Sequence, residues 1–307
     1  MPLSLHRRRL ALSPQPSALR ADLLAVAFAV LATAACDVTI KDGDVSLGQS
    51  QGRATREFSR TYPLNPNGRV EIVNGNGSID VTVGPPGSVG VNAVLSARAI
   101  TEERARQVLS EAAIEESATR DLVRLVSARR SRNEGSGSLD VAYQVTVPPG
   151  ASIELNGTNG KVKASGVGGP TKALVVNGQL DLADLHGAVD AGTVNGQLNV
   201  RMADVTAPIR LESTNGRITL EIPATTKATL SARAMNGGLS VKGFDTPEST
   251  GRRIRELESE LNGGGPEIDV RVMNGGINIV GVQESKESRE SKESGEPRRL
   301  MKELKAR

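Results

Sequence analysis

The sequence predicts an all-β fold in which a short strand unit repeats and stacks as a β-solenoid, accompanied by one short helix. Three observations favour this fold. The dipeptide Asn-Gly recurs at nearly constant spacing, an alternating run of polar and apolar residues follows each copy, and aromatic residues make up only 2% of the chain. A period near 20 residues is typical of repeat proteins, in which each unit buries its apolar side only against its neighbours.

The repeated Asn residues are expected to form a structural ladder at the corners of the stack. Their successive separations are 18, 18, 20, 21 and 38 residues, so the last step is close to a doubled period. Asn and Gly tolerate the positive φ that a sharp corner requires. Units stacked in register about 4.8 Å apart allow the side-chain amides to hydrogen-bond between units. The predicted ladder consists of Asn159, Asn177, Asn195, Asn215, Asn236 and Asn274.

Alternation within each strand separates buried from exposed side chains. Pairs such as Leu180 with Leu182 and Leu198 with Val200 are predicted to face the core. The residues between them face solvent and form our candidate binding face, which comprises Lys163, Asp181, Asn199, Thr219 and Ser240.

An antiparallel β meander or sandwich is the alternative fold, because Asn-Gly is also the strongest short hairpin signal. A second turn, such as residues 185–188, would then alternate with Asn-Gly and would also give a period near 18. We favour the solenoid because the strand after each Asn-Gly repeats with the same length and facing.

One folded domain is predicted at residues 58–282, with its regular repeats in residues 151–282. Residues 69–73 and 78–83 predict a first pair of strands, joined through the Asn-Gly segment 74–77. Residues 89–97 alternate again.

Residues 101–113 predict the helix, with Thr101 as its N-cap and two glutamates in its first turn. Its apolar face is expected to cover a sheet or a solenoid end and comprises Ala105, Val108, Leu109 and Ala112. Strands are predicted again at residues 122–128 and 139–147, whereas the charged segment 252–261 is compatible with a short helix or a loop. Residues 283–307 are low in apolar residues and predict a disordered tail.

The N-terminal segment predicts export and a lipid anchor. Residues 1–35 combine three arginines with a short apolar run, which indicates a signal peptide. Cys36 is the only cysteine and follows Thr33-Ala34-Ala35, a segment that resembles a bacterial lipobox, so Cys36 is the candidate lipidation site. An ordinary signal peptide with a free thiol at Cys36 is the alternative. Residues 36–57 are expected to be a flexible tether.

Charge excludes nucleic acid as a partner. The chain has 38 Lys and Arg against 35 Asp and Glu, but the predicted signal peptide holds four of the basic residues and one of the acidic ones. The remaining chain therefore has no net charge, and the electrostatic footprint of a nucleic-acid-binding protein is missing.

The sequence contains no recognisable catalytic, cofactor or metal motif. Its only histidine after the signal segment, His186, is expected in an exposed turn. The outward column holds a single carboxylate, Asp181, whereas a glycosidase needs two. Asp184 and Asp190 are expected to be scattered away from Asp181. We therefore predict a protein without enzymatic activity, metal or cofactor.

Residues 145–155, the Asn-Gly repeats and the segment 263–270 resemble bacterial envelope β-strand-repeat domains known as putative adhesins, a family of unknown function. The resemblance spans roughly residues 58–282. It implies a right-handed β-solenoid-like domain exposed at the cell envelope, and the family has no established catalytic residues.

Together these patterns predict a lipid-anchored envelope protein that faces the periplasm or the cell surface and binds an envelope glycan or protein on its polar sheet face. A regulatory envelope-stress protein that acts through a membrane partner is the main alternative. A polysaccharide-modifying enzyme is the third hypothesis.

Overall fold

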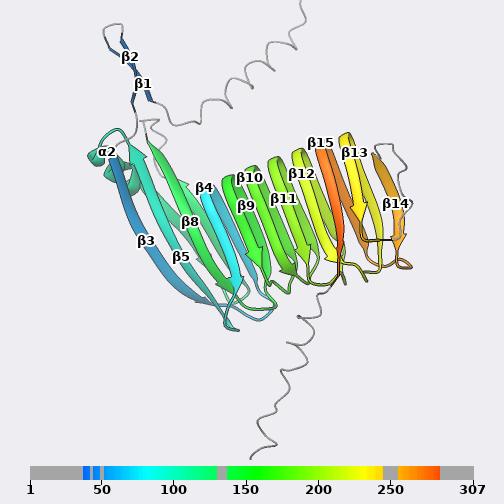
Figure 1. Ribbon diagram of the computed structural model, residues 1–307. Coiled ribbons are helices and arrows are strands. Elements are labelled where there is room, and N and C mark those ends of the chain that lie inside the picture. The colour runs from blue at the N-terminus through cyan, green and yellow to red at the C-terminus, as the bar shows by residue number, and fades with distance from the viewer. Residues whose placement is uncertain (1–36, 42–43, 49–51, 130–136, 245–254, 284–307) are drawn as a thin grey trace, which may run out of the picture. The chain divides into compact units, whose positions relative to one another are not determined.

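The computed structural model in Figure 1 describes residues 37–41, 44–48, 52–129, 137–244 and 255–283. The chain separates into two units, Met1–Ser50 and Gln51–Arg307. The predicted signal peptide, the predicted lipidation site Cys36 and residues 284–307 of the predicted tail lie outside the described residues.

The region predicted as a tether contains regular strands. In the first unit, β1 (Asp37–Lys41) and β2 (Asp44–Gly48) form an antiparallel hairpin. In the second unit, β3 (Gly52–Pro63) pairs antiparallel with β5 (Ser88–Ala99) over its whole length. Residues 52–57 therefore belong to a strand instead of a tether, because their backbone groups are hydrogen-bonded to β5 although most of their side chains are polar.

Long strands stack side by side in parallel and form the repeated part of the domain (Figure 1). Their residues pair in register, so that Leu180 lies beside Leu198 and Leu198 beside Ile218. This parallel register confirms a solenoid-like fold and excludes the antiparallel meander for these strands. They are β4 (Arg69–Val83), β9 (Ser152–Ser165), β10 (Thr171–Leu185), β11 (Val189–Met202), β12 (Ile209–Pro223), β13 (Ala228–Lys242) and β15 (Glu267–Val282).

Each repeated strand bends at its Asn-Gly corner, so that its two halves enclose a common core. In β10 the buried residues Ala173 and Val175 are two apart, and the next buried residues, Leu180 and Leu182, follow after a step of five. All four belong to the same aliphatic core. The outward surface of the halves before Asn-Gly is called the leading face below, and that of the halves after it the trailing face.

At one end of the stack the two layers continue on separate strands. The first half of β4 pairs with β7 (Leu122–Arg129), and its second half pairs with β8 (Ser138–Val147). Beyond them, β6 (Ala112–Ala118) extends the leading layer, while β5 and β3 extend the trailing layer. Residues 69–73 and 78–83, predicted as two strands, are thus the two halves of the single bent strand β4. The corner between them leads the chain from one layer into the other, whereas a hairpin would reverse its direction.

The predicted helix is confirmed as α2 (Glu102–Glu111), which connects β5 to β6 and packs against β3 and β5. The hydroxyl oxygen of Thr101 caps it by accepting a hydrogen bond from the backbone N–H of Arg104 at 3.2 Å. Ala105 and Val108 are fully buried. Within the described residues, no helix is long and apolar enough to cross a membrane.

The other end of the stack departs from sequence order. β15 lies between β12 and β13, so the spatial order is β12, β15, β13 and β14 (Glu256–Leu261). The expectation of a helix or loop at 252–261 is wrong for β14, which pairs antiparallel with β13. The physical reason is alternation, since Leu257 and Leu261 pack inward while the glutamates between them face solvent.

Candidate functional site

The Asn ladder fixes the corner between the two faces. Each Asn donates a side-chain N–H to the Oδ1 of the Asn in the preceding unit, over distances of 2.7 to 3.0 Å. The predicted ladder is confirmed, with two changes. Asn76 of β4 begins it, and the spatial order ends Asn215, Asn274, Asn236 because β15 precedes β13.

Glycine after each ladder Asn is required by packing. A Cβ atom at Gly178 would lie 1.8 Å from the carbonyl oxygen of Gly160, and the φ of Gly178 is +146°. The obstacle is backbone of the neighbouring unit, which cannot move aside as a side chain can. These corners therefore serve the architecture, and any binding role belongs to the faces that they separate.

The trailing face carries the five residues that we predicted as a binding face. Lys163 lies in register with Asp181, Asp181 with Asn199, and Asn199 with Thr219. Ser240 lies on the same face but is not adjacent to Thr219.

Two further residues belong to this column, although their distance in sequence did not indicate it. Asn278 of β15 separates Thr219 from Ser240, and Asp80 of β4 lies beside Lys163. The column therefore contains two carboxylates, where sequence reasoning had found one. Lys163 lies between Asp80 and Asp181, so the two acids do not face each other across an open site.

Asp181 is held as a carboxylate by its neighbours. It accepts hydrogen bonds from Gln179 and Asn199 and pairs with Lys161, each at 2.8 Å. Partial burial by itself raises the pKa of Asp181, but these three contacts outweigh burial and hold the pKa below its ordinary value. A general acid needs a raised pKa, so this environment is unsuited to acid catalysis by Asp181.

A shallow hollow of about 320 Å³ adjoins the trailing column. Asp181, Asn199 and Thr219 line it, together with an ion pair at 2.8 Å between Arg201 and Glu221. Because the charged groups here are paired with each other, the hollow offers few unmatched groups to a ligand.

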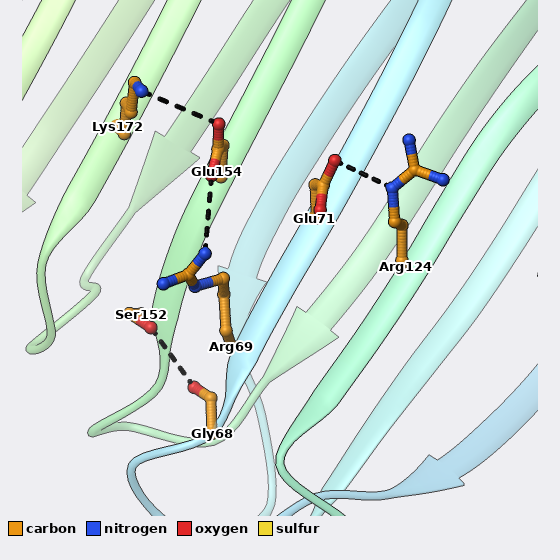
Figure 2. Close-up of polar contacts among 7 residues, drawn as sticks. All are labelled: Gly68, Arg69, Glu71, Arg124, Ser152, Glu154 and Lys172. Carbon is orange, nitrogen blue, oxygen red and sulfur yellow. Dashed lines mark hydrogen bonds and ion pairs between the residues drawn. The ribbon is translucent and has the colours of Figure 1, made fainter. Parts of the chain in front are cut away.

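The leading face carries a second column, which sequence reasoning missed. Figure 2 shows Glu154 between two cations, with its carboxylate oxygens 3.8 Å from Arg69 and 3.8 Å from Lys172. Next to Glu154, Glu71 of β4 pairs with Arg124 of β7 at 2.9 Å (Figure 2).

Beyond Lys172 the leading column continues through Asp190, Arg210 and Asp269, so charge alternates from strand to strand. These residues line a groove of about 670 Å³ that runs across the strands. The recurrence of Glu154, Lys172, Asp190 and Arg210 at the repeat period is visible in the sequence. Asp269 could not be aligned with them, because its strand is displaced in the stack.

An apolar patch adjoins this groove on the same face. Leu174, Met235 and Met273 are 45%, 56% and 48% exposed and gather around one hollow, and grouped apolar exposure of this kind is more informative than a single exposed side chain. Together with Gly192 and Val194 they line a second hollow of about 430 Å³. The leading face thus combines apolar surface with charged residues, as protein-binding surfaces do.

Other candidate catalytic groups are dispersed. His186 lies in an exposed turn, as predicted, with its Nδ1 3.1 Å from Asp204. Asp184 is the second-to-last residue of β10 and has a φ of 54°, and Asp190 lies on the leading face, away from Asp181. No group of three His, Cys, Asp or Glu residues within the described part of the chain is arranged to hold a metal ion.

Several solved structures are similar to this chain at low sequence identity. A putative cell adhesion protein from Clostridium sporogenes is 14% identical, with a TM-score of 0.37, and the match covers 74% of this chain and 100% of that chain. A putative adhesin from Bacteroides fragilis is 11% identical, with a TM-score of 0.38, and the match covers 74% of this chain and 97% of that chain.

No curated protein sequence matches this chain. Residues 114–280, more than half of the chain, match the family described as Toastrack DUF4097, and they extend from within β6 to near the end of β15. The chain therefore belongs to the Toastrack DUF4097 family.

Proposed function

We propose that this chain is a non-enzymatic cell-envelope protein that binds a protein partner on its leading face. The observation that carries this proposal is the combination, on one face of the sheet, of a charge-alternating groove and an adjoining patch of exposed Leu and Met side chains. Protein interfaces combine apolar contacts with polar and charged ones, and flexible Met side chains adapt to a partner's shape.

A protein partner is favoured over a glycan because the leading face lacks aromatic platforms. Sugar rings pack their C–H groups on aromatic faces. Both tyrosines, Tyr62 and Tyr143, are buried in the core. The two phenylalanines after the signal segment, Phe58 and Phe244, are partly buried against the core and lie outside the groove and the apolar patch.

The envelope location in this proposal rests on residues 1–35 and Cys36, whose pattern predicts export and lipidation. A lipid anchor would hold the domain at a membrane surface. One acyl chain gives weak membrane binding, so stable anchoring needs more than one chain or a second membrane contact.

Two other candidates use the same fold. The trailing column from Lys163 to Ser240 is a second possible binding surface. It is the weaker one because the exposed Leu174, Met235 and Met273 lie on the other face. A regulatory role would require a membrane signalling protein as the partner, and the leading face suits that partner equally well. An enzymatic role has the least support, because Asp181 has a lowered pKa.

The test is co-sedimentation of the purified chain with isolated envelopes from its host. Reversing two leading charges, Lys172→Glu with Arg210→Glu, should weaken sedimentation at least about tenfold, since interfacial charge pairs contribute on the order of 1.5 kcal/mol or more. Protease treatment of the envelopes should abolish binding, and periodate oxidation of their glycans should not.

The matched control changes the trailing face, with Lys163→Ala and Asp181→Ala, and should bind like the wild type. Loss of binding in this control, with normal binding by the leading-face variant, would transfer the function to the trailing column. Loss after periodate alone would identify a glycan as the partner.

A further inference from the structure

We propose that the protein partner is a second copy of this chain, bound leading face to leading face around a two-fold axis that runs parallel to the strands between β12 and β15. The inference rests on the proposed function, because it uses the same face and names its occupant. Rotation about this axis exchanges β12 with β15, β11 with β13 and β10 with β14 between the two copies.

Four charged residues at the centre of the leading face form a checkerboard. On β12, Arg210 contacts Glu212 at 2.6 Å, and on β15, Arg271 contacts Asp269 at 2.7 Å. In register, Arg210 lies beside Asp269 and Glu212 beside Arg271. The rotation therefore places Arg210 opposite Asp269 of the second copy, and Glu212 opposite Arg271 of the second copy. In this arrangement each of the four charged residues faces a residue of opposite charge in the second copy. Because of the two-fold symmetry, each of the two ion pairs occurs twice in the dimer.

The flanking strands are also complementary, in shape and polarity. The exchange of β11 with β13 places the half-buried Val194 opposite the exposed Met235. It also places Gly192, which leaves a notch between Leu174 and Glu212, opposite the long side chain of Arg233. Apolar surface therefore meets apolar surface, and the smallest residue meets one of the largest.

The outermost pair of strands, β10 and β14, adds one attractive contact and forms the edge of the interface. Exchange of β10 with β14 places Lys172 opposite Glu258, which is an attractive pair. Leu174 falls opposite Glu256 at the rim, where water remains. An axis between β11 and β12 would instead place the apolar Leu174 opposite Arg271, closer to the centre of the interface. It would also place Glu212 opposite Gly192, which offers no positive charge to pair with it. The axis between β12 and β15 is therefore preferred.

Asp269 supplies an independent reason to expect a donor from outside the chain. It is only 9% exposed, and it lines the groove. Its Oδ2 pairs with Arg271, but its Oδ1 is buried without a hydrogen-bond partner among the described residues. A buried carboxylate oxygen without a donor is costly. Because this chain covers Oδ1, Arg210 of the second copy would donate to it only after the Asp269 carboxylate turns toward the groove.

The size of the surface indicates a reversible dimer. Six strands about 4.8 Å apart and half-strands of about seven residues give a patch of roughly 29 by 23 Å. Its projected area of about 670 Å² is somewhat below the roughly 800 Å² per partner of a standard stable interface. We therefore expect a dissociation constant in the micromolar range, in which neighbouring copies on a crowded membrane would associate.

The decisive experiment is sedimentation velocity of the purified full-length chain and two single variants, Glu212→Arg and Arg271→Glu. The wild type should dimerise between about 1 and 100 μM. Each variant alone places like charges opposite each other twice per dimer, so its dissociation constant should rise at least about 100-fold, or about tenfold per broken pair.

An equimolar mixture of the two variants should recover the dimer. In a mixed pair, the new Arg at 212 meets the new Glu at 271, while the native Arg271 meets the native Glu212. This recovery also shows that both variants are folded. Gln197→Glu, on the exposed trailing face, is the matched control and should dimerise like the wild type.

Two results would overturn this inference: a wild-type chain that stays monomeric at about 100 μM, or single variants that dissociate and do not recover on mixing. Envelopes from a host strain lacking this chain separate the two proposals. Binding that persists on such envelopes and still requires Lys172 and Arg210 would reject the second copy as the partner and leave the proposed function standing.

Discussion

Replacing Leu198 with Asp tests the assignment of the two sides of each strand most directly. Leu198 lies in β11, in the middle of the stack, with Leu180 on one side and Ile218 on the other in register. Its side chain is 0% exposed. The substitution removes an aliphatic side chain from the core and puts a carboxyl group among aliphatic neighbours.

The magnitude follows from two contributions. Truncation of a fully buried Leu costs about 3 to 5 kcal/mol, because the stacked units cannot collapse into the space. A buried carboxyl group without a hydrogen-bond partner adds about 1 to 3 kcal/mol, even if it is protonated. The expected loss of about 4 to 8 kcal/mol is comparable with the whole stability of a typical domain, which is about 5 to 15 kcal/mol.

Thermal unfolding followed by circular dichroism measures this loss. For a domain of this size, 1 kcal/mol shifts Tm by about 2 to 4 °C, so Leu198→Asp should lower Tm by about 8 °C or more. Gln197→Asp is the matched control, because Gln197 is next to Leu198 in sequence but is exposed. It lies in register beside Arg217. Its Tm should stay within about 2 °C of the wild type. Equal melting temperatures for the two variants would refute the assignment of inward and outward positions.

Three further predictions address the corner, the trailing column and the anchor. Gly178→Ala should cost several kcal/mol and lower Tm by about 10 °C or more, because the new methyl group would meet the backbone oxygen of Gly160; an unchanged Tm would contradict the corner geometry. Because the pKa of Asp181 is lowered in the folded state, its contribution to stability is present above its unfolded pKa of about 3.9 and is lost as pH falls through the lower folded value. Asp181→Asn, which leaves Lys161 without its ion-pair partner, should therefore lower Tm at pH 7 and flatten the fall of Tm below about pH 4; parallel Tm profiles for both proteins would exclude this role. Cys36→Ser should move the protein from the membrane pellet to the soluble fraction, and a variant that still pellets at normal processed size would reject lipidation at Cys36.

Much of the repeated architecture could be predicted because its determinants are local and periodic. The spacing of Asn-Gly, the alternation on both sides of Leu198 and the cap at Thr101 each depend on residues close in sequence. The charged leading column was also within reach of the sequence, since Glu154 and Lys172 recur at the repeat period. A comparison of the residues that follow each Asn does not reveal this column, because its residues precede the Asn.

The sequence by itself determined that the chain repeats, which side of each strand faces the core and why Asn and Gly occupy the corners. These properties follow from steric and hydrogen-bonding demands that every unit meets alike. Only the tertiary structure decided that β4 begins the stack and that β15 enters between β12 and β13. The physical reason is that strand pairing across long separations depends on matching whole edges and faces, and no local pattern specifies which of several similar strands becomes the neighbour. The checkerboard of Arg210, Glu212, Asp269 and Arg271 exists only because of that order.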